Sequence, residues 1–158
     1  QIIPYKNSRF YQKTTLDIDD SSTVVYSETI VPGRIAMGEM FDFDVCYLKT
    51  EGVINQKIQF RDSSLLMPKT QKIQSLVMFD DKTILTSVYV LTKKHVTRIN
   101  DLINQMFSNI QGISGGSSIM PNNSGISIRI LGNSSEDQKI TIHQILKIIR
   151  KEILPEYI

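Results

Sequence analysis

The sequence contains one cysteine, two histidines and no apolar run near the roughly 20 residues that span a bilayer. A lone Cys46 excludes an internal disulfide and agrees with a reducing, cytoplasmic location. His95 and His143 stand far apart and show none of the close spacings that build a closed metal site. The net charge of +2 is too small to indicate binding to nucleic acid or to a membrane surface.

Two common enzyme motifs are also missing. The sequence has no Gly-x-Ser-x-Gly segment, the turn that presents a nucleophilic serine in many hydrolases. The segment Gly115–Ser118 lacks the Gly-Lys-Ser/Thr ending of a phosphate-binding loop and does not lead into a helix. We therefore predict a protein that is not an enzyme by itself and holds no cofactor tightly.

The 158 residues are enough for one domain with a real core, and the 41% of hydrophobic and 22% of charged residues are ordinary globular values. The chain opens at Gln1 without a charged-then-apolar leader and enters strand-like sequence at once. We therefore expect it to be part of a longer protein.

Strand-like alternation dominates the first two-thirds of the chain. Residues 23–31 alternate, and Pro32-Gly33 then marks a turn. A second run is predicted from Met37, and a third after a turn at Glu51-Gly52. Two further strands are predicted at 73–79 and 84–91, the second apolar on both faces, as in a strand covered on two sides.

The hydrophobic period then becomes helical. Apolar spacing predicts a helix from Val96 that ends before Gly112, followed by an ordered surface loop over 112–125 and a short strand over 126–130. A second helix is predicted from Ser135, where a capping box begins, to a point before Pro155. The pattern indicates a mostly antiparallel β body with two helices toward the C-terminus.

Four carboxylates lie in the segment from Glu28 to Asp44. Alternation places Asp42 and Asp44 on a face opposite the phenylalanines, which is typical of a solvated face. Glu28 and Glu39 instead share the apolar faces of their predicted strands, where an unpaired carboxylate is costly. Arg34 lies between them and could pair with either one. A structural Arg–Glu clamp and a polar passage inside the β body are both open at this point.

Three segments together resemble the urease accessory protein family UreD, also called UreH. The first is IPYKNSRFYQKTTLDID from Ile3, with Arg9 and Gln12 in the matching pattern, and the second is ETIVPGRIAMGEMFDFD from Glu28. The third, IMPNNSGISIRILGNSS from Ile119, is similar to a stretch near the family's C-terminus. The matching positions of the second and third segments are Glu28, Gly33, Arg34, Gly38, Glu39, Phe41, Pro121, Gly125, Arg129 and Gly132.

Family members usually carry a further N-terminal part, whose motifs are missing here. The resemblance therefore implies that residues 1–158 form a single UreD-like domain from the C-terminal portion of such a protein. It also implies an irregular β-helical or stacked-sheet body with a pair of helices.

The resemblance implies a urease maturation chaperone, a scaffold that binds UreF, the GTPase UreG through UreF, and urease apoprotein while nickel passes to the urease active site. On this reading Glu28 and Glu39 face an internal channel as transient Ni²⁺ ligands, and Arg34 holds the hairpin. Asp42 and Asp44 are further candidates for the polar interior.

Two alternatives remain open. One is a β-sheet hydrolase that uses Glu28 and Glu39 as acid and base, which requires both carboxyls in one open cleft. The other is a plain interaction module whose Glu–Arg cluster is only structural.

Overall fold

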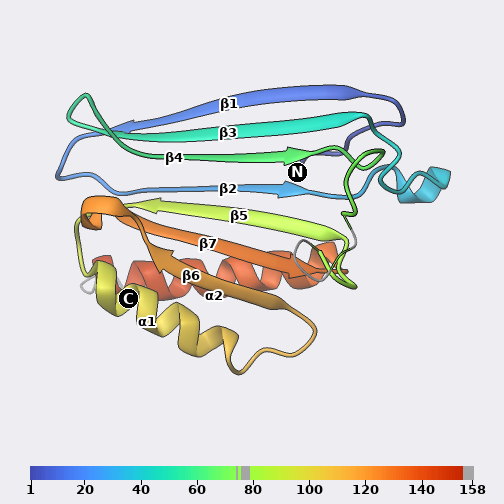
Figure 1. Cartoon of the computed structure of the whole chain (residues 1–158). Coiled ribbons are helices and arrows are strands. Elements are labelled where there is room, and N and C mark those ends of the chain that lie inside the picture. The colour runs from blue at the N-terminus through green and yellow to red at the C-terminus, as the bar shows by residue number, and fades with distance from the viewer. Residues whose placement is uncertain (74, 76–78, 155–158) are drawn as a thin grey trace.

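The computed structural model describes residues 1–73, 75 and 79–154 and has three layers. A sheet of order β1-β3-β4 packs on a sheet of order β2-β5-β7-β6, and two helices cover the far face of the second sheet (Figure 1). The prediction of a mainly β body with two helices toward the C-terminus is confirmed, while a β-helical winding stays a prediction. The elements are β1 (Arg9–Ile18), β2 (Val24–Ile30), η1 (Ile35–Met37), β3 (Val45–Ile54), β4 (Lys57–Leu66), β5 (Ile84–Leu91), α1 (Val96–Phe107), β6 (Ser114–Ile119), η2 (Pro121–Asn123), β7 (Gly125–Gly132) and α2 (Ser135–Ile153).

The chain alternates between the two sheets. β1 pairs in parallel with β3, from Arg9 opposite Val45 to Ile18 opposite Ile54, while β2, between them in sequence, belongs to the other sheet. All other strand pairs are antiparallel. This order stacks β1 over β2 and β4 over β7, because residues of these strands contact each other across the sandwich.

The predicted turn at Glu51-Gly52 is wrong, because both residues lie inside β3. The turn falls instead at Asn55 and Gln56, which both take positive φ, as a two-residue type I′ hairpin requires. Gly52 leaves room for its cross-strand neighbour Phe60 and for Leu91 of the facing sheet, since a Cβ there would lie 2.1 Å from the Phe60 ring and 2.9 Å from Leu91. The glycine marks a close approach rather than a turn.

The strand predicted from Met37 is also wrong over most of its length. Residues 35–37 form a 3-10 turn, and β3 begins only at Val45. Gly38 and Phe41 both take positive φ, at 74° and 55°, which breaks any extended run. The alternation of acids and phenylalanines therefore lies in a loop.

The segment 112–125, predicted as an ordered surface loop, contains regular secondary structure. It holds β6, an edge strand that pairs with β7, and the short helix η2. Of the strand predicted over 73–79, positions 74 and 76–78 lie outside the described residues, while Ile73 and Phe79 are buried and joined by a backbone hydrogen bond. The strand over 84–91 is confirmed and is buried on both faces.

The two helices close the core on one side of the four-stranded sheet. Ile99 and Ile103 of α1 and Ile145 of α2 are fully buried against the isoleucines of β7. The N-cap of α2 is Ser134, one residue before the predicted start, and its hydroxyl accepts from the Asp137 amide at 3.2 Å. No helix among the described residues is long and apolar enough to cross a membrane.

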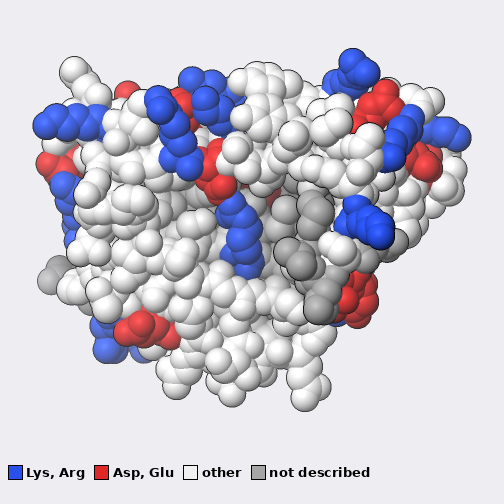
Figure 2. All heavy atoms as spheres, viewed as in Figure 1, with Lys and Arg blue, Asp and Glu red and all other residues white. Residues whose placement is uncertain are grey.

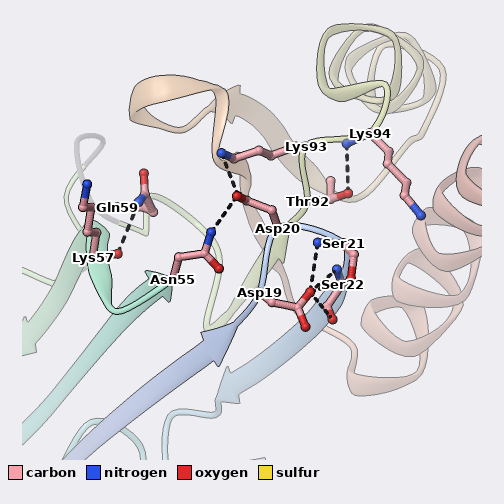
Figure 3. A network of polar contacts seen from close by, with 10 residues as sticks. All are labelled: Asp19, Asp20, Ser21, Ser22, Asn55, Lys57, Gln59, Thr92, Lys93 and Lys94. Atoms are coloured by element: carbon pink, nitrogen blue, oxygen red, sulfur yellow. Dashed lines mark hydrogen bonds and ion pairs between the residues drawn. The ribbon is translucent and has the colours of Figure 1, made fainter.

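Loops from three parts of the chain meet at one end of the sandwich (Figure 3). The Asp20 carboxylate accepts from Asn55 of the β3–β4 turn at 2.6 Å and pairs with Lys93, which follows β5, at 2.8 Å. Asp19 accepts from the backbone and hydroxyl groups of Ser21 and Ser22. These contacts tie the β1–β2 crossover to its neighbours.

Candidate functional site

A band of polar side chains crosses the middle of the sandwich, between two apolar clusters. One cluster surrounds Phe43 and Leu48, and the other surrounds Phe60 and Leu91. Strand register explains the band, because polar residues occupy one aligned row in each sheet. The facing rows are Thr14, Thr50 and Asp62 in one sheet and Glu28, Ser87 and Arg129 in the other.

Glu28 lies at the β1–β2 side of this band and is 7% exposed. Its carboxylate accepts from the Gln12 amide and the Tyr26 hydroxyl, each at 3.1 Å. Burial raises the pKa of Glu28 above its ordinary value and Asp62 adds to the rise, while the Tyr26 hydrogen bond and Arg129 oppose it. Among the described residues, no Lys or Arg forms a salt bridge with Glu28.

Arg129 and Asp62 form an ion pair at the β4–β7 side of the band. The Tyr89 hydroxyl donates to the Asp62 carboxylate at 2.9 Å, and the Arg129 guanidinium lies 5.3 Å from the centre of the Tyr89 ring. Tyr89 also stacks on Tyr26 at 6.3 Å between ring centres. The two tyrosines therefore connect the Glu28 group to the Asp62–Arg129 pair.

Surface pockets lie at both ends of the band. At the β1 end, a pocket of about 450 Å³ is lined by Gln12 and the segment 1–5. At the β4–β7 end, a pocket of about 320 Å³ is lined by Ser64, Leu131 and Arg129. Because Gln12 and Arg129 each belong to a pocket and to the band, polar groups lead from one surface to the other.

Thr50 of the band and Cys46 of the neighbouring apolar cluster bear on the chemistry of the band. The Thr50 hydroxyl is buried and makes no well-formed hydrogen bond within the described residues, yet it lies close enough to Glu28 to oppose the rise that burial causes in the pKa of that carboxyl, so it can join Glu28 in contacting a water or ion between the sheets. Cys46 is fully buried, and burial raises the pKa of its thiol to about 11. Cys46 is therefore protonated at neutral pH and is a poor metal ligand.

The structure does not bring Glu39 to Glu28. Glu39 lies in the loop before β3, where Arg34 binds it through two hydrogen bonds of 2.9 and 2.5 Å. The Lys6 amide donates to the same carboxylate at 3.2 Å, and Arg34 stacks over the Tyr5 ring at 4.3 Å. Arg34 holds the pKa of Glu39 below its ordinary value. This geometry is the structural Arg–Glu clamp, one of the two interpretations that the sequence allowed. Within the described residues, Glu39 and Glu28 have no hydrogen-bond partner in common.

Asp42 and Asp44 also lie in this loop. Asp44 pairs with Lys69 at 2.5 Å and with Arg9 at 3.7 Å, while the Asp42 carboxylate accepts from the Met40 amide at 3.4 Å. Neither side chain faces the band, which disfavours both as lining groups. Arg9 is 80% exposed in its side chain, so this surface pair contributes little to stability.

The glycines of the second motif shape the clamp. Gly33 takes φ 140°, and a Cβ there would lie 3.0 Å from the Glu39 carbonyl oxygen. Gly38 takes φ 74° and ends the 3-10 turn between Arg34 and Glu39. Gly132 in β7 is closely packed as well, since a Cβ would lie 2.7 Å from Ile113.

The described residues 1–73, 75 and 79–154 contain no group of three or more His, Cys, Asp or Glu side chains placed to hold a metal ion. His95 and His143 are both exposed, at the start of α1 and on α2. Sequence reasoning found Glu28 but missed Tyr26, Thr50, Asp62 and Tyr89. These residues come together through the register of the strand pairs, and the sequence alone does not show which strands pair.

The fold and the band define a layered β protein whose buried acid is enclosed between sheets, with its two candidate glutamates in separate places. That arrangement fits a scaffold or accessory protein better than a two-carboxylate hydrolase. The family model described as UreD urease accessory protein matches residues 1–157, and the chain belongs to this family. The name is that of an accessory protein rather than an enzyme, in agreement with the prediction.

Individual relatives support the assignment. The chain is 32% identical over 139 residues to the urease accessory protein UreD of Cenarchaeum symbiosum, which covers 86% of this chain and 48% of the relative. It is 32% identical over 157 residues to UreD of Yersinia pseudotuberculosis, covering 97% and 49%. UreD 2 of Brucella canis is 29% identical over 163 residues, covering 98% and 54%. The chain thus spans about half the length of the curated relatives it matches.

Proposed function

We propose that the chain acts in urease maturation as part of a scaffold that passes nickel toward urease apoprotein, and that the polar band is the passage. The observation that carries the proposal is Glu28, a nearly buried carboxylate with no salt bridge among the described residues. A divalent ion supplies the positive charge that such a group lacks. The relatives' name, urease accessory protein, supports the same process.

The donors of the band suit transit rather than storage. Carboxylate, hydroxyl and amide oxygens bind Ni²⁺ less tightly than imidazole or thiolate ligands do. Glu28, Thr50 and Asp62 offer oxygens in the two facing rows, between pockets at the two surfaces. A passage must release its cargo, so a site with few ligands favours onward movement.

Arg129 is the feature that such a passage must accommodate. Its guanidinium pairs with Asp62 beside the β4–β7 pocket, and a cation there repels Ni²⁺. We propose that this pair closes that end at rest and that the Arg129 side chain swings outward when the ion passes. The family resemblance extends the proposal to UreF, to UreG through UreF, and to a cytoplasmic location.

Glu28→Gln in the intact protein tests the proposal. The amide keeps the shape and can still accept from Gln12 and Tyr26, but it removes the negative charge. We expect urease activity and urease nickel content in cells to fall at least about tenfold, as removal of a charged ligand from a metal path predicts. The amount of soluble scaffold should not change.

Asp101→Asn is the matched control, because Asp101 is an exposed acid on α1, away from the band. It should leave urease activation unchanged. If Glu28→Gln also leaves activation and nickel content unchanged, the passage does not run past Glu28. If Glu28→Gln lowers urease activation and nickel content together with the amount of folded protein, Glu28 is structural and the chain is an interaction module.

A further inference from the structure

The outer face of the three-stranded sheet is left uncovered in the described part of the chain. The helices pack on the other sheet, and no helix or strand of the described residues lies over the outer face of β1, β3 and β4 (Figure 1). Charged side chains gather over the upper half of Figure 2, where Figure 1 places this sheet, and the lower half is mostly uncharged. This face combines an apolar groove with a group of cations.

The groove follows one cross-strand row. Tyr11, Tyr47 and Leu65 are aligned across β1, β3 and β4, and the two tyrosine rings lie 5.4 Å apart at a tilt. Tyr11 is 61% exposed and Leu65 is 44% exposed. With Arg9, Phe10 and Val45 they line a groove of about 460 Å³. An exposed aromatic row of this kind is typical of a protein contact surface.

The cations lie on the same face, on the rows next to the groove. Lys13, Lys49 and Arg61 all pair with Glu51, at distances of 2.9, 3.1 and 3.0 Å. Three cations share one carboxylate, which leaves a surplus of two positive charges. The pKa of Glu51 is held at about 2, chiefly by Lys13 and Lys49, so this carboxylate stays ionised. The surplus is therefore permanent at neutral pH.

We propose that this face binds an acidic segment of a partner protein, with an apolar side chain in the Tyr11–Tyr47–Leu65 groove and carboxylates on Lys13, Lys49 and Arg61. Charge complementarity selects an acidic partner, and the groove selects one with an apolar anchor. Nucleic acid fits less well, because the surplus charge is small and the tyrosine rings contact each other rather than standing free for bases. The surface is separate from the polar band, on the opposite face of the same sheet.

A synthetic peptide with a central leucine and phenylalanine flanked by glutamates is the probe. In NMR titrations of the whole chain, it should shift the resonances of Tyr11, Tyr47 and Leu65, and added salt should weaken its binding. Lys49→Glu and Tyr47→Thr should each weaken binding about tenfold. Lys139→Glu, a charge reversal on the exposed surface of α2, is the matched control and should bind as the parent does.

Four outcomes would overturn the proposal. They are equal binding of a peptide in which lysines replace the glutamates, tighter binding of an oligothymidylate, resonance shifts confined to α1 and α2, and self-association of the chain that Tyr47→Thr abolishes. The last two would assign the contact to another surface or to a second copy of the chain. Because the shifts are mapped on the parent chain, the test does not depend on any variant folding.

Discussion

One nearly buried carboxylate lies on each side of the three-stranded sheet, Glu28 of β2 facing it from the other sheet and Glu51 on its own outer face, and the two behave in opposite ways. Glu28 lies against the inner face and is 7% exposed, and Glu51 lies on the outer face and is 6% exposed. The pKa of Glu28 is raised by burial, while the pKa of Glu51 is lowered to about 2 by Lys13 and Lys49. Exposure is nearly equal, but burial between the sheets dominates at Glu28, whereas the cations around Glu51 outweigh the effect of burial there. A carboxylate without cations remains available to a metal ion.

The largest expected effect is on stability, and it distinguishes Arg129, beside the band, from Arg61, on the outer face of the three-stranded sheet. Arg129→Met leaves Asp62 without its ion pair beside the band, and we expect a loss of about 2 kcal/mol in the free energy of unfolding, below the roughly 3–5 of a fully buried pair. Arg61→Met, the matched change on the outer face, leaves Glu51 paired with Lys13 and Lys49 and should cost much less. Urea unfolding measures both, and equal losses would contradict the comparison.

The next prediction concerns the carboxylates themselves. At pH 7 we expect Glu28→Gln to raise the midpoint of urea unfolding, because it removes a charge whose burial is unfavourable. Glu51→Gln should lower the midpoint, because it leaves three cations close together without their counterion. Shifts of the same sign in the two variants would show that the surroundings of these carboxylates are alike.

The smallest effect appears as a difference in pH dependence. The Glu51 pKa falls from 4.5 to about 2 on folding, so its contribution to stability is complete above pH 4.5 and is lost as the pH falls toward 2. The raised pKa of Glu28 acts in the other direction, since folding favours its protonated form and acidification adds stability. The melting temperature, measured by thermal unfolding at each pH, should therefore fall less steeply between pH 6 and pH 2 in the Glu51→Gln variant than in the parent chain.

The elements with strong periodicity were predictable from the sequence. The strand over 84–91 is apolar on both faces because the sandwich covers one side and the helices cover the other. The helix from Val96 was equally clear, with buried residues at helical spacing. β6 was missed because Ser114–Ile119 has no apolar alternation and is held by pairing with β7. A strand defined by its partner leaves little local signal.

The candidate site was half predictable. Glu28 was found because an acid on an apolar face of a strand is unusual. Glu39 was misplaced, since the alternation around it crosses Gly38, where the backbone turns to positive φ. Asp62 could not be paired with Arg129 in advance, because they are 67 positions apart and meet only through the stacking of two sheets. Tertiary packing creates that contact, and no local rule predicts it.

The parallel pairing of β1 with β3 has a consequence for synthesis. When β1 leaves the ribosome its hydrogen-bonding partner does not yet exist, and the strand that follows it belongs to another sheet. Within residues 1–158, the ten-residue strand β1 therefore cannot form its pairing with β3 until β3 has been made. Strand pairing that waits for a later segment leaves backbone groups open to other partners, so synthesis of β3 limits how long β1 is exposed to such contacts.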